Sequence, residues 1–456
     1  MKKLIGAAIA VAFLLPGTPA LSQEKIVVWW SKSFNKAEND SLLAEIAAFE
    51  KKTGVKVDLS LYATQDMIPK VVSALDAGNP PDVAHVNLFD MQTAGKWAFE
   101  GKLDDLTPML EPIKDIFAKD VLETTYLYND QDKKHAYYAF PVKMQSFHNT
   151  YWIDMLETAG FKEADIPDTW NEYWSFWCDK VQPAYRKATG KRVYGIGLAM
   201  SVGSSDTYQI FMDFLDAYNV EMVDKDGKLL VDDPETRKGI ISALDDFTKP
   251  YINGCVPPSA TGWKDPDNNV AFNNRTVLMT PNGTISVAVK WLDDSVNPAL
   301  TKEQQEQALK NYKENIRTMG FPKKPDGSPM VNRIAVKIGL VFKQGQNVPR
   351  AREFAQFLLT DERLTSHVEG GLGRFFPVTK AGQAKSFWQE DPHRKTVYDQ
   401  ITGPAKPYEF IYNYKFATLN NENVWAVALN RIVNDKISPE QAADELIARI
   451  KKVVND

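Results

Sequence analysis

Strand and helix patterns alternate over residues 26–86, and this alternation limits the chain to few folds. Strands are predicted at residues 26–30, 55–59 and 82–86, and the two segments between them carry apolar residues at helical spacing. Strands that alternate with helices form a largely parallel sheet covered on both faces. The 456 residues allow two or three domains. We therefore predict an α/β fold with more than one domain.

Two adjacent tryptophans end the first predicted strand, and their side chains must point to opposite faces. Because this strand is expected at the centre of its sheet, we expect Trp29 in the core. Trp30 follows at the carboxyl end of the strand, where parallel α/β sheets bind ligands. We therefore expect Trp30 to face a cleft.

The first 22 residues have the pattern of a secretory signal peptide. Lys2 and Lys3 precede an apolar run, Leu4 to Leu15, which is too short to span a bilayer. The small residues of Ala20-Leu21-Ser22 predict cleavage near Ser22, and no cysteine lies nearby to carry a lipid anchor. No later segment is apolar enough to be a membrane span. We therefore predict a protein exported into a bacterial periplasm.

Charge and motifs argue against several classes of function. The formal net charge of −5 lacks the basic excess expected of nucleic-acid-binding proteins. The five histidines and two cysteines show no metal-ligand spacing, so we predict no metal and no cofactor. No nucleophile or dinucleotide motif is present, and we predict no enzyme. A secreted carbohydrate-active enzyme stays as a remote alternative, because a glycosidase needs only two suitably placed carboxylates.

Cys178 and Cys255 are the two cysteines of the chain. In an oxidising compartment an even number favours pairing, and two cysteines allow one connectivity. The alternative is two separate buried thiols. We predict the disulfide.

Six blocks of sequence resemble, in the same order, the bacterial extracellular solute-binding proteins of the carbohydrate ABC-transporter type, the maltose-binding-protein-like group. The blocks run from about residue 26 to the C-terminal region: "FEKKTGVKV" with "SALDAGNPPDV", "EGKLDDLTPML", "YYAFPVKMQSFHNTYWIDMLETAGF" with "IPDTWNEYW", "AFNNRTVLMTPNG", "AREFAQFLLTDE" and "GGLGRFFPV". Each block alone is a weak signal, and their common order is a strong one.

The resemblance implies a two-lobe periplasmic-binding-protein fold. Each lobe is expected to be a mostly parallel sheet flanked by helices, with a hinge between the lobes and the ligand in the cleft. We place the N-terminal lobe at residues 23–141 plus 282–345 and the C-terminal lobe at 142–281 plus 346–456. Crossings between the lobes are expected near residues 141, 279–282 and 342–349.

Sugar sites combine aromatic rings, which stack on C–H faces, with polar groups that hydrogen-bond the hydroxyls. The ends of the predicted strands, the polar loop at residues 261–269 and the positions matching the family's ligand-contacting segments supply twelve candidates. They are Trp30, Ser31, Asp66, Asn87, Asp90, Lys143, Gln145, Trp263, Asn282, Gly283, Arg374 and Trp425.

The resemblance implies a monomeric substrate-binding component of an ABC importer. It would bind a sugar, oligosaccharide or sugar-like polyol between its lobes and deliver it to the permease subunits. The alternative keeps the fold and takes an anionic solute, such as a sugar acid or a glycerol phosphate. Lys143 and Arg374 motivate that alternative, because a guanidinium can hold a carboxylate by two hydrogen bonds.

Overall fold

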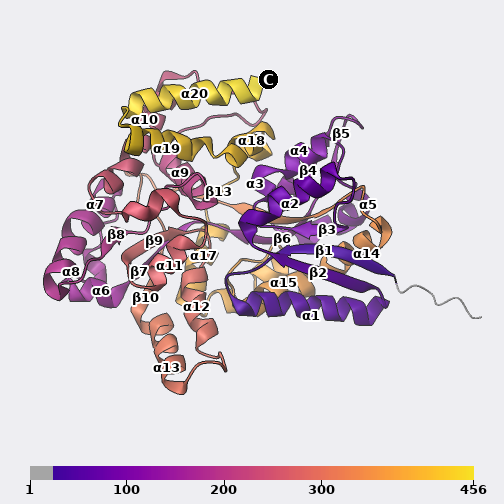
Figure 1. Cartoon of the computed structure of the whole chain (residues 1–456), viewed down its shortest axis with the longest axis horizontal. Helices are drawn as coiled ribbons and strands as arrows, with labels where there is room; N and C mark the ends of the chain where they lie inside the picture. Colours follow the sequence, from indigo (N-terminus) through magenta and orange to yellow (C-terminus); the bar gives the residue numbers. More distant parts are fainter. Residues whose placement is uncertain (1–23, 456) are drawn as a thin grey trace, which may run out of the picture.

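The computed structural model describes residues 24–455. The predicted signal peptide and its cleavage site lie outside these residues. The described chain forms two α/β lobes side by side, each built on its own sheet (Figure 1). The two-lobe α/β prediction is therefore confirmed.

The sheet of the first lobe has five strands in the order β2-β1-β3-β12-β6. β1 (Lys25–Ser31) pairs in parallel with β2 (Lys56–Tyr62) and β3 (Val83–His85). β12 (Ala335–Val341) pairs antiparallel with both β3 and β6 (Phe140–Gln145).

The sheet of the second lobe has four strands in the order β10-β7-β9-β8. β7 (His148–Trp152) pairs antiparallel with β10 (Ile316–Met319) and β9 (Val277–Asn282), and β9 pairs in parallel with β8 (Tyr194–Ile196). Both sheets are thus mixed rather than mostly parallel. The antiparallel pairs involve strands next to the crossings between lobes, which no local strand-helix alternation predicts.

Helices cover both faces of the first sheet. α1 ends at Gly54, whose φ of 75° is the left-handed conformation that glycine adopts readily. The helices that belong to this lobe are α1 (Lys36–Thr53), α2 (Thr64–Asp76), α3 (Phe89–Gln92), α4 (Ala94–Phe99), α5 (Thr107–Leu110), α14 (Val348–Leu358), α15 (Asp361–Gly370), α16 (Lys380–Gln383) and α17 (Pro392–Thr402). A hairpin of β4 (Tyr126–Asn129) and β5 (Lys134–Tyr137) stands beside α4.

The second lobe is richer in helix. Its core contains the aromatic cluster that begins in α7, where Trp170, Tyr173 and Trp177 have no exposed surface. The helices are α6 (Ile153–Thr158), α7 (Trp170–Ser175), α8 (Gln182–Thr189), α9 (Ser205–Ala217), α10 (Pro234–Ile252), α11 (Asp267–Asn273), α12 (Ser286–Asp294), α13 (Lys302–Lys310), α18 (Lys415–Glu422), α19 (Val424–Asp435) and α20 (Pro439–Asn455).

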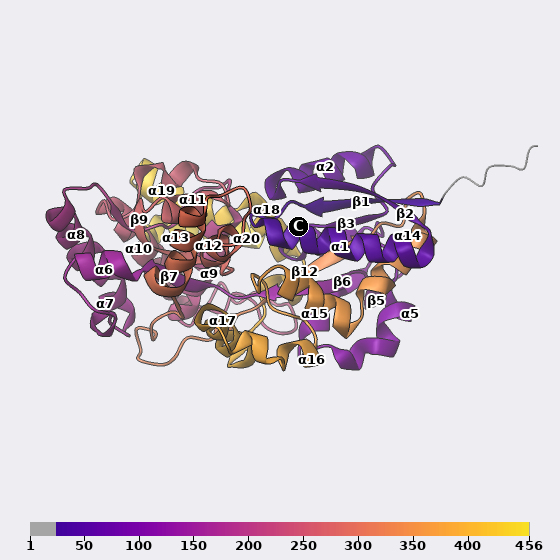
Figure 2. The same ribbon diagram turned by 90° about the horizontal axis from the view of Figure 1, so that it is seen from below.

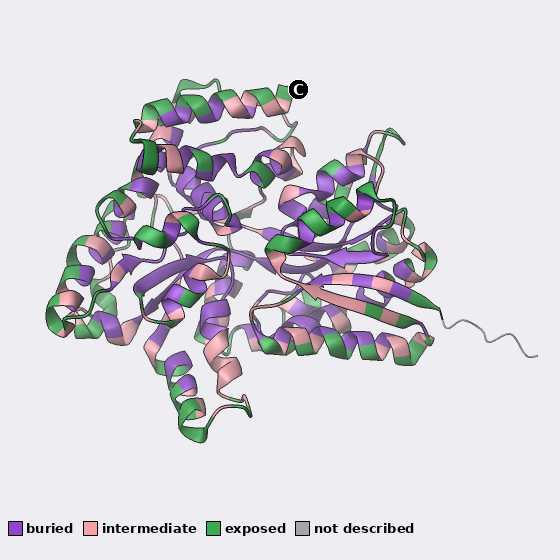
Figure 3. Cartoon of the chain, viewed as in Figure 1, coloured by how far each residue is buried: buried purple, intermediate pink, exposed green. Residues whose placement is uncertain are grey.

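The disulfide prediction is confirmed. Cys178 and Cys255 are bonded, with their Cα atoms 5.2 Å apart, and they join the segment after α7 to the loop after α10. Burial follows the layers of the fold: β3, β6, β7, β9 and β12 are buried throughout, the edge strand β2 is half-buried or exposed, and the outer helices alternate buried with exposed residues (Figure 3).

The apolar cores divide the chain differently from the predicted lobe boundaries. Residues 351–401 contribute Phe354, Phe376 and Trp388 to the core of the first lobe, and β10 belongs to the second sheet. In Figure 2 α17 lies below the junction of the two lobes. We propose that the first lobe comprises residues 24–145 plus 335–402 and the second 148–319 plus 405–455.

A buried ion cluster holds the two segments that run between the lobes at residues 320–334 and 403–406. Arg333, in the short strand β11 (Asn332–Arg333), donates to Asp216 at 2.5 and 2.8 Å. It also donates twice to Glu409 at 2.8 Å, just after β13 (Ala405–Lys406), with which β11 pairs. Planar bidentate pairs of this kind are directional. The crossing segments are therefore fastened to α9 of the second lobe.

The two tryptophans of β1 take positions opposite to the expected ones. Ile26, Val28 and Trp30 share a face covered by α1, α14 and α15, and Trp30 is only 3% exposed. Its ring lies 4.3 Å from that of His85. Trp29 is partly exposed on the other face, where its edge meets Tyr62 at 5.4 Å. Residues of α1, α14 and α15 enclose Trp30, so Trp30 is the core residue.

Candidate functional site

A pocket of about 260 Å³ lies between the lobes, beyond the carboxyl ends of β1, β2 and β3. This edge is where ligands bind in parallel α/β sheets. The first lobe contributes the loops that follow these strands and the segment after α15: Lys32, Ser33, Phe34, Ala63, Thr64, Gln65, Asn87, Leu88, Arg374 and Phe375. Gln145, at the end of β6, lies at the crossing.

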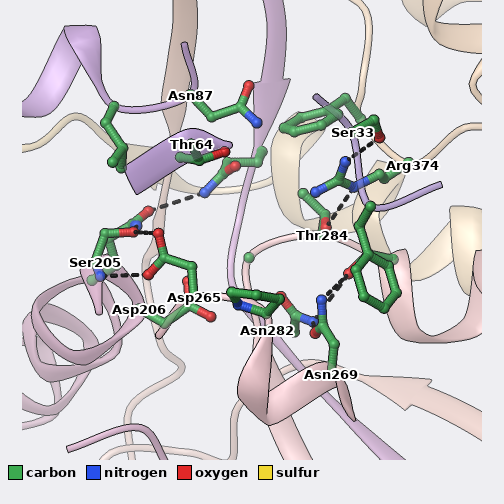
Figure 4. Close-up of a pocket in the computed structure, with 18 of the residues that line it drawn as sticks. Ser33, Thr64, Asn87, Ser205, Asp206, Asp265, Asn269, Asn282, Thr284 and Arg374 are labelled. Atoms are coloured by element: carbon green, nitrogen blue, oxygen red, sulfur yellow. Dashed lines mark hydrogen bonds between the residues drawn. The ribbon is translucent and has the colours of Figure 1, made fainter. Parts of the chain in front are cut away.

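The second lobe lines the pocket with the starts of three helices and the end of β9. Its residues are Ser205, Asp206, Gln209, Asp265, Pro266, Asn269, Asn282, Gly283, Thr284 and Ser286. Figure 4 shows two polar groups that face each other: Ser205, Asp206 and Asp265 on one side, and Ser33, Thr284 and Arg374 on the other.

Arg374 is oriented by a carboxylate behind the pocket wall. Its Nη1 donates to Glu38 Oε2 and to Ser33 Oγ, both at 2.7 Å, and its Nε lies 3.4 Å from Thr284 Oγ1. Glu38 also accepts from Lys143 Nζ at 2.5 Å. The charge of Arg374 is thus partly balanced, while its planar group still borders the pocket.

Electrostatics keeps this cluster ionised. Burial by itself would raise the pKa of Glu38, but Lys143 and Arg374 outweigh burial and hold that pKa well below its usual range. Burial lowers the pKa of Lys143, and the neighbouring Glu38 carboxylate opposes that shift. Glu38 therefore presents a permanent negative charge that fixes the two cations.

The opposite wall carries two neighbouring carboxyl groups. Asp265 accepts from the backbone N–H of Ser205 at 2.6 Å and from the hydroxyls of Ser204 and Ser205 at 2.9 and 3.0 Å. Asp206 accepts from Asn268 at 3.1 Å. Burial raises the pKa of both carboxyls, and the charge of Asp265 raises that of Asp206 further. A pair of this kind offers hydrogen-bond acceptors, and a donor when one member is protonated.

Amides and hydroxyls complete the wall. Asn282 Nδ2 and Asn269 Nδ2 each donate to Ser286 Oγ at 3.2 Å. Gln145 Nε2 donates to Gln209 Oε1 at 3.0 Å, which joins the two lobes across the pocket. Asn87 Oδ1 is buried and accepts no hydrogen bond from the described residues. Asn87 also lines the pocket, so its amide group is placed beside a bound ligand.

A family model described as bacterial extracellular solute-binding protein matches residues 44–396, more than half of the chain. The chain belongs to this family. The resemblance predicted from the six sequence blocks is therefore confirmed. A search of curated proteins gave no match.

Solved structures of other solute-binding proteins share the fold. A Thermotoga lettingae ABC-transporter solute-binding protein bound to α-D-tagatose has a TM-score of 0.75 at 19% identity, over 94% of this chain and 100% of that chain. T. maritima MalE3 with maltose gives 0.72 at 17%, over 94% and 99%. An Arthrobacter chlorophenolicus sugar transporter with laminaribiose gives 0.72 at 16%, over 94% and 99%. At these identities the likeness shows the fold.

The pocket of this solute-binding protein brings together five of the twelve predicted site residues. They are Asn87, Gln145, Asn282, Gly283 and Arg374. Each lies at the end of a strand or helix that points at the cleft, which is why strand order and the family's segments could locate them.

The three predicted stacking tryptophans lie outside the pocket. Trp30 is buried under α1 and α15, and Trp425, with no exposed surface, donates to Asn420 at 2.8 Å. Trp263 is 7% exposed and donates to Ser259 at 3.1 Å. The rings that line the pocket are Phe34 and Phe375 instead.

The four remaining predicted residues also lie elsewhere. Ser31 is buried at the end of β1, and Asp66 is exposed on α2, while Thr64 and Gln65 before it line the pocket. Lys143 is held by Glu38. Asp90 is fully enclosed beside Lys337 at 3.1 Å. A buried charge needs a counter-ion, and strand alternation alone does not reveal which one it finds.

The sequence reasoning missed the acidic wall and Glu38. Asp265 and Asn269 lie in a polar run, residues 264–269, and that run is the signal that could have identified them. Asp206 and Gln209 lie one helical turn apart at the start of α9. Glu38 gives no sequence signal, because its partners are 105 and 336 positions away.

Among residues 24–455 no helix is long and apolar enough to cross a membrane. The same residues contain no cluster of three or more His, Cys, Asp or Glu side chains that could hold a metal ion.

Proposed function

We propose that this protein is the periplasmic substrate-binding component of an ABC importer. It holds a sugar, oligosaccharide or sugar-like polyol between its lobes and delivers it to the permease subunits. We propose further that it acts by binding and not by catalysis, and as a monomer. Asn87, Gln145, Asn282, Gly283 and Arg374 contact the ligand, together with Ser33, Thr64, Asp206 and Asp265.

The composition of the pocket wall is the observation that carries this proposal. Both lobes contribute amides and hydroxyls around one cavity, and the second lobe adds the carboxyls of Asp206 and Asp265. Alternating donors and acceptors match the hydroxyls of a sugar, and Phe34 or Phe375 can cover a C–H face. The solved structures with tagatose, maltose and laminaribiose support a carbohydrate ligand.

The charges of the pocket give less support to an anionic ligand. Both cations that motivated it, Lys143 and Arg374, already face Glu38. Asp206 and Asp265 on the opposite wall would repel a carboxylate or phosphate. A neutral polyol is not repelled by these carboxyl groups and needs no free cation in the pocket.

A calorimetric screen tests the proposal. Monosaccharides, oligosaccharides and polyols form one set, and uronic acids and glycerol 3-phosphate form the second. We expect saturable binding within the first set and weaker or no binding in the second. Binding confined to the second set would replace the neutral ligand by the anionic one, and binding to neither set would overturn the carbohydrate proposal.

Closure of the lobes is the accompanying mechanism. The ligand binds one lobe, the other closes over it, and the hinge absorbs the backbone change. Small-angle scattering should then give a smaller radius of gyration with ligand than without it. An unchanged radius at saturation would contradict closure.

A further inference from the structure

The pocket opens into a second hollow on the side of α2. This hollow, the outer groove, has a volume of about 330 Å³ and runs between α2 and the second-lobe residues 202–204 and 420–423. It shares five lining residues with the pocket: Thr64, Gln65, Leu88, Ser205 and Asp265. The two hollows therefore form one cleft with a boundary at Asp265.

Charge is distributed unevenly along this cleft. The pocket is lined by Lys32, Asp206, Asp265 and Arg374, whereas Asp265 is the one charged residue among those that line the outer groove. The groove instead presents amide side chains, of which Gln92 and Asn421 are examples. The outer groove therefore recognises its ligand by hydrogen bonds and shape rather than by charge. Such a groove suits an uncharged sugar unit.

Apolar side chains from both lobes border the outer groove. Val72 of α2 is 39% exposed and Val202 of the second lobe is 54% exposed. Exposed valines on both walls of a polar groove offer contact to C–H groups while the amides serve hydroxyls. That combination fits the two kinds of surface on a pyranose or furanose ring.

The walls of the outer groove are held in place without a ligand. Asn423 Nδ2 donates to the carbonyls of Val202 and Ser204 at 3.1 and 2.9 Å, which fixes the segment 202–204. Asn420 Nδ2 donates to Met91 O at 3.1 Å and ties α18 to α3 of the first lobe. A preformed groove lowers the ordering cost of filling it.

We infer that the ligand is an uncharged oligosaccharide of at least two units, with one unit in the pocket and the next in the outer groove past Asp265. The inference rests on the proposed function and narrows it to the longer members of the ligand class. A monosaccharide would fill the pocket and leave the outer groove to solvent.

Calorimetry with matched ladders of sugars tests chain length. Each ladder pairs a monosaccharide with its own linear oligomers: glucose with maltose and maltotriose, glucose with cellobiose and laminaribiose, and xylose with xylobiose and xylotriose. In the ladder that binds, we expect the di- or trisaccharide to bind at least about tenfold more tightly than its monosaccharide. Equal affinity along that ladder overturns the inference and leaves the proposed function standing.

Blocking the outer groove provides the second arm. Gly203 lines the groove but not the pocket, and a Cβ there would meet Ser201 Oγ at an ordinary 3.4 Å, so Gly203→Leu should fold. We expect this variant to lose about tenfold or more in oligosaccharide affinity, with monosaccharide affinity unchanged. Gly262→Leu is the matched control, because a Cβ there meets no atom within 4 Å and the residue lines neither hollow.

The outcomes of these experiments distinguish the second subsite from the proposed sugar-binding function. Unchanged oligosaccharide affinity in Gly203→Leu overturns the second subsite. Parallel loss of both affinities also overturns it, because the groove would then be no separate subsite. Failure of the unsubstituted protein to bind any sugar or polyol overturns the proposed function, and this inference with it.

Discussion

Glu38 Oε1 accepts a hydrogen bond from Lys143 Nζ at 2.5 Å in the buried layer behind the pocket, with both side chains at most 8% exposed. Glu38 Oε2 reaches Arg374 on the pocket wall. Glu38→Gln keeps the shape but leaves Lys143 without a buried counter-ion, which costs about 3–5 kcal/mol. Urea unfolding at pH 7 measures this loss. The double variant Glu38→Gln/Lys143→Met removes the orphaned charge and should recover part of it; no recovery would contradict the pairing.

The stability difference between the unsubstituted protein and Glu38→Gln should depend on pH in one direction. The pKa of Glu38 in the folded protein lies below its ordinary value of 4.5, because Lys143 and Arg374 outweigh burial. The ionised carboxylate therefore contributes its full stability above pH 4.5, and this contribution is lost as the pH falls below that value. The stability gap between the protein and Glu38→Gln should be largest at pH 6–7 and shrink toward pH 3. A gap that widens at low pH would contradict this assignment.

Asn87→Ala tests the pocket with little effect on folding. The buried Oδ1 of Asn87 has no donor among the described residues, so its removal costs the folded protein few contacts. Loss of a ligand hydrogen bond to the Asn87 amide group would cost about 1–2 kcal/mol, or roughly 5- to 30-fold in affinity. Calorimetry and thermal melting measure the two effects separately. Asn434→Ala, on the exposed face of α19, is the control and should change neither.

The sequence predicted the ends of the strands well, but it predicted poorly how deeply individual side chains are buried. Asn87 follows a strand that the alternation predicts, and Asn282 and Gly283 lie in a segment that resembles the family, so their place at the cleft could be foreseen. The burial of Trp30 could not be foreseen, because alternation tells which residues share a face but not how deeply the helices bury each face. The helices that bury Trp30 include α15, more than 300 positions away along the chain.

Trp30→Ala should lower the free energy of unfolding more than Trp29→Ala does. Trp30 is enclosed by three helices, and truncation of a buried tryptophan costs about 3–5 kcal/mol. Trp29 is partly exposed and loses mainly its edge contact with Tyr62, about 0.5–1.5 kcal/mol beyond burial. Denaturant unfolding gives both values. A smaller loss for Trp30→Ala than for Trp29→Ala would contradict the burial of Trp30.

His367 makes stability depend on pH in the weakly acidic range. Burial, helped by the charge of Lys143, lowers the pKa of His367 to about 4, so the folded protein resists its protonation. Between pH 6.5 and 4 the unfolded chain binds the extra proton, and stability therefore falls as the pH falls. His367→Asn should reduce this slope by up to about 1.4 kcal/mol per pH unit. His135→Asn, at an exposed position, is the matched control. An unchanged slope in His367→Asn would contradict the assignment.

Removal of the disulfide should destabilise the second lobe through the unfolded chain. The bond between Cys178 and Cys255 closes a loop of 77 residues, and cross-linking a loop of this length contributes about 4.5 kcal/mol in the chain-entropy model. The variant with both cysteines changed to Ser should therefore unfold at lower denaturant. A reductant should shift the unsubstituted protein by a similar amount and leave the variant unchanged, which controls for packing at the site. Two free thiols in unfolded, unreduced protein would show that the bond does not form.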